Sequence, residues 1–229
     1  MALSLKQVRK IKANYRSVTG HILFRNEKIP YESTLERDFL LYFSSLKEVV
    51  GIIPQPVQID FTKHGRTYTY TPDFLVQFSS QVKNSKSLLV EVKPESEWRD
   101  HWRDWSEKWK AAQLFAKKEG FVFHIYDENR IRHQALKNLN FLNNFKQIQV
   151  DSSSLAHLLG EINNREMTTV ETLLECYFKA GEYRKQGHRV LFHLMACGLV
   201  DFDIWADDIQ SEKLTLWASN HERFRLRVF

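Results

Sequence analysis

The sequence has few of the residues on which several common kinds of site depend. Only two cysteines occur among 229 residues, Cys176 and Cys197, which is too few for a disulfide framework or a cysteine-ligated zinc site. Low cysteine content is typical of a reducing compartment, so we expect a cytoplasmic protein. The nine histidines include no His-x₃-His or His-Glu-x-x-His spacing, so no zinc-binding pair is indicated.

Phosphate-binding loops and membrane segments are also missing. The eight glycines show no Walker spacing, so we assign any ATP requirement to a partner. No run approaches the roughly 18 apolar residues of a membrane span. The charged segment from Lys6 to Lys12 lacks the apolar core of a signal peptide, so we expect neither secretion nor membrane insertion.

The composition is that of a folded chain. Hydrophobic residues make up 43% and charged residues 27%, close to the globular average. A length of 229 residues allows one large domain or two small ones. The pattern of expected helices and strands changes near residue 150, so we predict domains at 1–150 and 151–229.

The net charge of +5 is concentrated at the N-terminus. Residues 1–28 carry one acidic residue, Glu27, and seven basic ones: Lys6, Arg9, Lys10, Lys12, Arg16, Arg25 and Lys28. A basic arm of this kind suits a phosphate backbone, because each neutralised phosphate releases counterions. A solvated amphipathic helix is the alternative interpretation.

Residues 29–150 have the pattern of a mixed α/β domain. Helical spacing of apolar residues alternates with short runs of β-forming residues, and the pair His64-Gly65 predicts a hairpin turn. The predicted helices cover 31–50 and 98–118, and the predicted strands cover 57–61, 66–71, 74–78, 88–93 and 121–126. Gly120 is the expected end of the second helix.

Residues 151–229 predict a small winged-helix-like domain. Three short helices are expected at 155–159, 169–180 and 187–198, followed by a β-wing from 199–203 and 214–217. This region carries nine basic and twelve acidic residues. We therefore favour docking to a partner protein over DNA binding, which stays open as the alternative.

The chemistry concentrates on Asp73, Glu91 and Lys93. Asp73 precedes a predicted strand, and Glu91 and Lys93 lie two residues apart on the next, so both point to one face. Carboxylates at the ends of adjacent strands can hold Mg²⁺ or Mn²⁺, and a nearby lysine can orient or deprotonate a water. This pattern favours metal-dependent phosphodiester hydrolysis. Glu36, on the preceding helix, would complete the cage.

Structural explanations for the same residues remain open. Asp after Pro is common in turns, and Glu-x-Lys on a strand is often an exposed charge pair. The apolar run Leu88-Leu-Val predicts instead a central, buried strand. Charged residues are rare in such strands, because their burial is unfavourable unless they are paired or bind a ligand. Glu32, one turn before Glu36, is the alternative third acid.

A stripe of four tryptophans follows Lys93. Trp98, Trp102, Trp105 and Trp109 fall on one face of the predicted helix and favour core packing. Basic residues flank the stripe, so contact with DNA is the alternative. They are Arg99, Arg103, Lys108 and Lys110.

Four motif blocks resemble the N-terminal catalytic domain of the TnsA family, over about residues 8–130. They occur in family order and read Tyr31-Glu-Ser-Thr-Leu-Glu-Arg-Asp-Phe, Gln55-Pro, Tyr70-Thr-Pro-Asp-Phe and Val90-Glu-Val-Lys-Pro. TnsA is the endonuclease subunit of heteromeric cut-and-paste transposases. The resemblance implies a restriction-endonuclease-like mixed sheet flanked by helices, followed by a winged-helix-like domain.

The resemblance also implies roles for individual residues and partners. Glu36, Asp73 and Glu91 would be the metal-binding acids, with Val92 in the metal-binding set, and Lys93 would be the catalytic lysine. The protein would cut the 5′ strands at transposon ends as an Mg²⁺-dependent (or Mn²⁺-dependent) endodeoxyribonuclease. A DDE-type transposase would process the 3′ ends. Double-stranded DNA and an AAA+ regulator ATPase are the other implied partners, and the assembled protein would associate with a bacterial nucleoid.

Two other classes of function remain open. A stand-alone restriction or repair nuclease of the same fold would share the catalytic residues but cut without partners. A non-catalytic adaptor would bridge DNA and protein, and its carboxylates would have no catalytic role. The mutation of Asp73 separates the adaptor from both nucleases.

Overall fold

The computed structural model describes residues 7–8, 18–80, 86–179 and 181–219. Its contacts divide the chain into two compact units, Met1–His133 and Gln134–Phe229. The two units are described separately below. Of the basic N-terminal residues, Lys6, Arg9, Lys10, Lys12 and Arg16 lie outside the described residues.

A four-stranded mixed sheet forms the centre of the first unit. Its strand order is β3 (Val49–Pro54), β6 (Phe74–Phe78), β7 (Leu88–Val92) and β8 (Val122–Tyr126). The first three strands pair antiparallel, and β7 pairs parallel with β8. All five residues of β7 are buried, as predicted from its apolar run.

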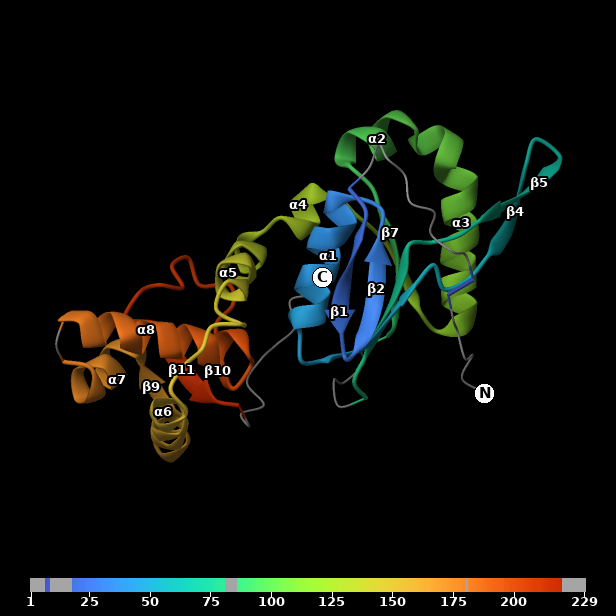
Figure 1. Ribbon diagram of the computed structural model, residues 1–229. Helices are drawn as coiled ribbons and strands as arrows, with labels where there is room; N and C mark the ends of the chain where they lie inside the picture. The colour runs from blue at the N-terminus through green and yellow to red at the C-terminus, as the bar shows by residue number, and fades with distance from the viewer. Residues whose placement is uncertain (1–6, 9–17, 81–85, 180, 220–229) are drawn as a thin grey trace. The chain divides into compact units, whose positions relative to one another are not determined.

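Helices cover both faces of this sheet. Helix α1 (Thr34–Ser45) packs Phe39 against Phe74, with ring centroids 5.4 Å apart. Helix α3 (Trp102–Glu119) packs Ala112 on the opposite face, against Leu75 and Leu89. Because Phe74 and Leu75 are consecutive strand residues, their side chains point to opposite faces of the sheet. Helices α1 and α3 therefore cover opposite faces (Figure 1).

Two hairpins and two short helices complete the unit. Strands β1 (Gly20–Phe24) and β2 (Glu27–Tyr31) pair through a turn at Arg25 and Asn26, so part of the basic N-terminal region is a hairpin. Strands β4 (Ile59–Lys63) and β5 (Arg66–Tyr70) pair through His64-Gly65, as predicted. The short helices are α2 (Glu95–Asp100) and α4 (Glu128–Ile131).

The structure differs from two of the predicted helices. The helix expected over 31–50 ends at Ser45. Residues 49 and 50, which we expected in that helix, belong to β3. The helix expected over 98–118 is divided at His101, whose φ of −107° and ψ of 10° interrupt the regular helix between α2 and α3. Helix α3 ends at Gly120 with a left-handed φ of 75°, as predicted.

The second unit contains four helices and a three-stranded antiparallel sheet among the described residues. The helices are α5 (Gln134–Asn143), α6 (Ser152–Arg165), α7 (Val170–Tyr177) and α8 (Gly181–Ala196). The sheet has the order β10 (Val200–Phe202), β11 (Thr215–Ala218) and β9 (Met167–Thr169). The three helices and the two strands expected after residue 150 are present, and β10 pairs antiparallel with β11, whereas β9 was not predicted.

The division at His133 lies before the border that we expected at residue 150. Helix α5 packs in the core of the second unit, where buried Leu142 contacts the cluster that contains Leu158 and Leu191. Buried Asn138 donates to the carbonyls of Ile204 and Ala206, both at 2.8 Å. These contacts assign α5 to the second unit.

None of the helices in the described part of the chain has both the length and the apolar composition that crossing a membrane needs.

Candidate functional site

Asp73 is fixed by backbone hydrogen bonds just before β6 begins. Its amide donates to the Val90 carbonyl at 2.9 Å, and its own carbonyl accepts from the Gln55 amide at 2.7 Å. Its side-chain Oδ2 accepts from the Val92 amide at 2.7 Å. The carboxyl is therefore attached directly to the strand that carries Glu91 and Lys93.

Glu91 is a buried acid with a polar partner at each carboxylate oxygen. Its exposed fraction is 3%. The Tyr70 hydroxyl donates to Oε2 at 2.6 Å, and the Lys108 ammonium lies 3.4 Å from Oε1. Burial of a charged group requires such partners, because an unpaired charge in the interior is strongly unfavourable.

Lys93 follows β7 directly and is half-buried. Its amide donates to the Tyr126 carbonyl at 3.0 Å, which continues the parallel pairing of β7 with β8 for one more residue. Alternation along the strand puts the Lys93 side chain on the same face as Glu91, as the sequence predicts.

The charges of these residues influence one another. Burial raises the pKa of Asp73 well above its usual value, and the neighbouring carboxylates of Glu91 and Glu36 raise it further. Burial lowers the pKa of Lys93, but the carboxylates of Asp73, Glu91, Glu97 and Glu36 together outweigh this effect and leave it raised. The site therefore favours a protonated lysine beside crowded acids.

Glu36 turns its carboxylate back toward the start of its own helix. Oε2 accepts from the Glu32 amide at 2.7 Å, Oε1 accepts from the Ser33 hydroxyl at 3.1 Å, and Ser33 caps the helix in return. This arrangement is a variant of the capping box, in which the acid accepts from the amide before the cap residue Ser33 and not from that of Ser33 itself. Burial raises the pKa of Glu36, and the charge of Glu32 adds to the rise.

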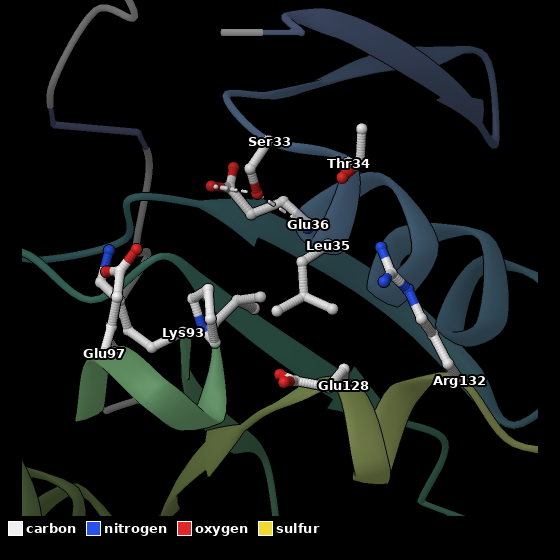
Figure 2. Close-up of a pocket in the computed structure, with 10 residues that line it drawn as sticks. Ser33, Thr34, Leu35, Glu36, Lys93, Glu97, Glu128 and Arg132 are labelled. Carbon is white, nitrogen blue, oxygen red and sulfur yellow. Dashed lines mark hydrogen bonds between the residues drawn. The ribbon is translucent and has the colours of Figure 1, made fainter. Parts of the chain in front are cut away.

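A pocket of about 340 Å³ lies beside Lys93, between the start of α1 and the end of β7. Its wall includes Glu36, Glu97, Glu128 and Arg132. In Figure 2 the Glu36 carboxylate points toward Ser33, and the Lys93 side chain extends toward Glu97. The pocket has both acidic and basic walls, which suits a phosphate group together with a cation.

The carboxylate oxygens of the site provide part of the ligand set that a hard cation such as Mg²⁺ needs. Asp73 and Glu91 supply two carboxylates at neighbouring strand ends, since Asp73 is hydrogen-bonded to Val90 and Val92, on either side of Glu91. Within the described ranges, no three His, Cys, Asp or Glu side chains are grouped closely enough to hold a metal ion. The structure thus brings Asp73, Glu91 and Lys93 to neighbouring strand ends, and Glu36 lies in the pocket beside Lys93 with its carboxylate bonded to Glu32 and Ser33.

Comparison with known families supports an endonuclease. Residues 46–128 match the family described as TnsA-like endonuclease N terminal. This part of the chain is therefore similar to the N-terminal domain of TnsA-like endonucleases. Asp73, Glu91, Val92 and Lys93 lie within the matched residues, and Glu36 lies before them. No curated protein matches the chain.

The core packing that we favoured for the four tryptophans is found for Trp109, which packs against the buried cluster of Leu75, Leu89 and Ala112, but the four do not form one buried stripe. None of the four is fully buried, and Trp102 is 54% exposed. The break at His101 separates Trp98 from the other three tryptophans. The Trp98 Nε1 donates to Asp127 at 3.2 Å. The buried residues of α3 are Ala112 and Ala116.

Two residues next to Glu91 were not predicted as part of the site. Tyr70 begins the Tyr-Thr-Pro-Asp block and is 7% exposed, so its position in that block was an available signal. Lys108 was noted only as a flanking basic residue, because nothing in a linear pattern shows which helical lysine turns inward.

Proposed function

We propose that this chain is the metal-dependent DNA endonuclease subunit of a heteromeric transposase and cuts the 5′, non-transferred strands at transposon ends. The observation that carries the proposal is the convergence of Asp73, Glu91 and Lys93 at the ends of β6 and β7, inside the TnsA-like segment. The mixed sheet with helices on both faces supports assignment to the restriction-endonuclease-like class.

Asp73 and Glu91 are the residues that would hold Mg²⁺ or Mn²⁺. The chemistry that such an ion supplies when bound is polarisation of the scissile phosphate and a lower pKa for water. Tyr70 and the Val92 amide fix one oxygen of each carboxylate and leave further lone pairs for a ligand. Glu36 would contribute after rotation away from Ser33.

Lys93 would act as a cation. Its raised pKa favours the protonated form, so we assign it to orienting the attacking water and stabilising negative charge on the phosphate. Of the two roles predicted from the sequence, orientation is thus preferred over removal of a proton. Arg132 in the same pocket is placed to bind a phosphate oxygen of the DNA backbone.

The second unit would dock a protein partner. Its order of elements from α6 to β11, with β11 central in the sheet, supports a winged-helix-like class. Within this unit, residues 151–229 include three more acidic than basic residues, which supports a protein partner over DNA. The DDE-type transposase and the AAA+ regulator are the proposed partners, and cleavage would be licensed by their assembly.

A cleavage assay tests the proposal. Supercoiled plasmid and transposon-end DNA are incubated with Mg²⁺ or Mn²⁺, with and without the transposase, for wild type and Asp73→Asn. We expect cutting at 5′ ends only with the partner, and loss of cutting in Asp73→Asn with partner binding retained. Glu107→Gln, which alters an acid of α3 that lies outside the pocket and pairs with Lys110, serves as the control and should keep most activity.

The other outcomes point to the alternative functions. Cutting by the protein alone would support an autonomous nuclease. An Asp73→Asn protein that supports transposition at the wild-type rate would support the adaptor.

A further inference from the structure

The ammonium of Lys108 lies inside an enclosure of aromatic side chains next to Glu91. Its Nζ is 4.4 Å from the ring centre of Trp105, 5.0 Å from Tyr70 and 5.6 Å from Trp109. The same atom lies 3.4 Å from Oε1 of Glu91. The electron-rich ring faces and the carboxylate all favour a cation at this point.

This position is unusual for a lysine on the surface of a helix. The Lys108 side chain is 17% exposed, whereas Lys110 on the same helix is 65% exposed and pairs with Glu107. Lysine is rarely enclosed in this way without a charged partner, because its ammonium is strongly hydrated. Here the partner is an acid of the candidate site.

The partners of Glu91 are divided between its two oxygens. Tyr70 donates to Oε2, and Lys108 lies at Oε1. The neutral Tyr70 can keep its hydrogen bond when a metal ion binds, because a carboxylate oxygen accepts more than one partner. Lys108 carries the same sign of charge as the ion and therefore opposes its binding.

We propose that Lys108 is a tethered cation of the candidate active site, which positions Glu91 while no divalent ion is bound and lowers the affinity of the site for that ion. The inference rests on the proposed function, since it takes Glu91 as a metal-binding acid. Lys108 acts through Glu91 and is therefore a positioning residue. The aromatic enclosure keeps the ammonium close to the site, so the opposition between the two cations persists throughout binding.

Direct measurement of metal binding tests the inference. Full-length protein is titrated with Mn²⁺, and free Mn²⁺ is measured by electron paramagnetic resonance, without DNA or partners. Lys108→Met removes the charge and keeps a flexible apolar chain against the rings. We expect its Kd for Mn²⁺ to fall at least about tenfold, because removal of a neighbouring positive charge favours a cation.

A matched control and a double-mutant cycle isolate the charge at Glu91. Lys110→Met removes a charge from the same helix at an exposed position, and its Kd should stay within about twofold of wild type. In a Glu91→Gln background, Lys108→Met should change the Kd by less than about threefold, because the two residues act as a pair.

The result that overturns the inference is an unchanged or higher Kd in Lys108→Met. If that variant does not fold by near-ultraviolet circular dichroism, Lys108→Gln tests the same charge and keeps a hydrogen-bond donor for Glu91. Wild-type binding that Asp73→Asn abolishes, together with no tightening in either Lys108 variant, would reject the tethered cation alone. Absence of any Asp73-dependent binding would reject both the metal site and this inference.

Discussion

The backbone amide of Val92 donates a hydrogen bond of 2.7 Å to the side chain of Asp73. This bond joins the start of β6 to the end of β7, the two strands that carry the acids of the candidate site. It also gives Val92 a role that depends on its backbone alone. The position of Asp73 is therefore determined by strand register, not by the loop before it.

Asp73→Asn should make the protein more stable and abolish cleavage. The pKa of Asp73 is raised in the folded state, so its stabilising contribution is complete below the ordinary Asp pKa and is lost as pH rises through the folded value. At pH 7 the neutral amide therefore removes the cost of burying or protonating this acid, and it can still accept from Val92. We expect a gain of about 0.5–2 kcal/mol in the free energy of unfolding, measured by urea denaturation. A loss of stability at pH 7 would contradict this account, and the gain should shrink toward pH 3.

The titration of Asp73 should depend on Glu91. Without metal, ¹³C NMR of the Asp73 carboxyl should give a midpoint above that of an ordinary Asp. Glu91→Gln should lower this midpoint, because it removes a neighbouring negative charge. Glu97→Gln is the control, because it removes a negative charge that acts on the neighbouring Lys93. Equal shifts in the two variants would mean that general charge, not the strand-end pair, sets the pKa.

Asp38 should matter to stability mainly through its two arginines. Its side chain is 8% exposed and pairs with Arg37 at 2.8 Å and Arg132 at 2.9 Å. Arg37→Met with Arg132→Met leaves the buried carboxylate unpaired and should cost about 3 kcal/mol or more, measured by urea denaturation. Asp38→Asn should cost less, about 1–2 kcal/mol, because both arginines are half-exposed and regain water. The reverse order of these two costs would count against the argument.

Gln55→Gly should stabilise the protein by about 1 kcal/mol. Gln55 adopts a φ of 45°, which favours glycine, and its buried Oε1 has no hydrogen-bond partner among the described residues. Gln55→Ala keeps the strained backbone and separates the two effects. In thermal unfolding, the melting temperature of Gln55→Gly should be higher than that of wild type and higher than that of Gln55→Ala. If glycine lowers the melting temperature, the Gln55 side chain has a stabilising contact that outweighs the strain.

The placement of Glu91 relative to Lys93 was predictable because strand alternation is strict. The two residues are two positions apart, and the hydrogen bond of the Lys93 amide to Tyr126 extends the pairing of β7 to Lys93. Glu36 was predicted by position, but the direction of its carboxylate depends on competition with the helix end. The Ser-x-x-Glu pattern from Ser33 contains that information, since it is the signature of a capping box.

Other features depended on contacts that a linear pattern does not contain. Strand β3 is a short apolar run that continues from α1 without a breaking residue, so helix and strand could not be distinguished by period. The break at His101 has no Gly or Pro to announce it. The turn at Arg25 and Asn26 has positive φ at both residues, but it lacks the glycine that usually indicates such a hairpin.

The parallel pairing of β7 with β8 has a consequence for synthesis of the chain. Strands β6 and β7 are neighbours in sequence and can pair as soon as both have been made. Strand β8 reaches β7 only after α2 and α3 have formed the crossover. Until then the apolar strand Leu88–Val92 is an open edge that can pair with another chain. Expression yield and aggregation should therefore be more sensitive to changes in β8 than its distance from Asp73 suggests.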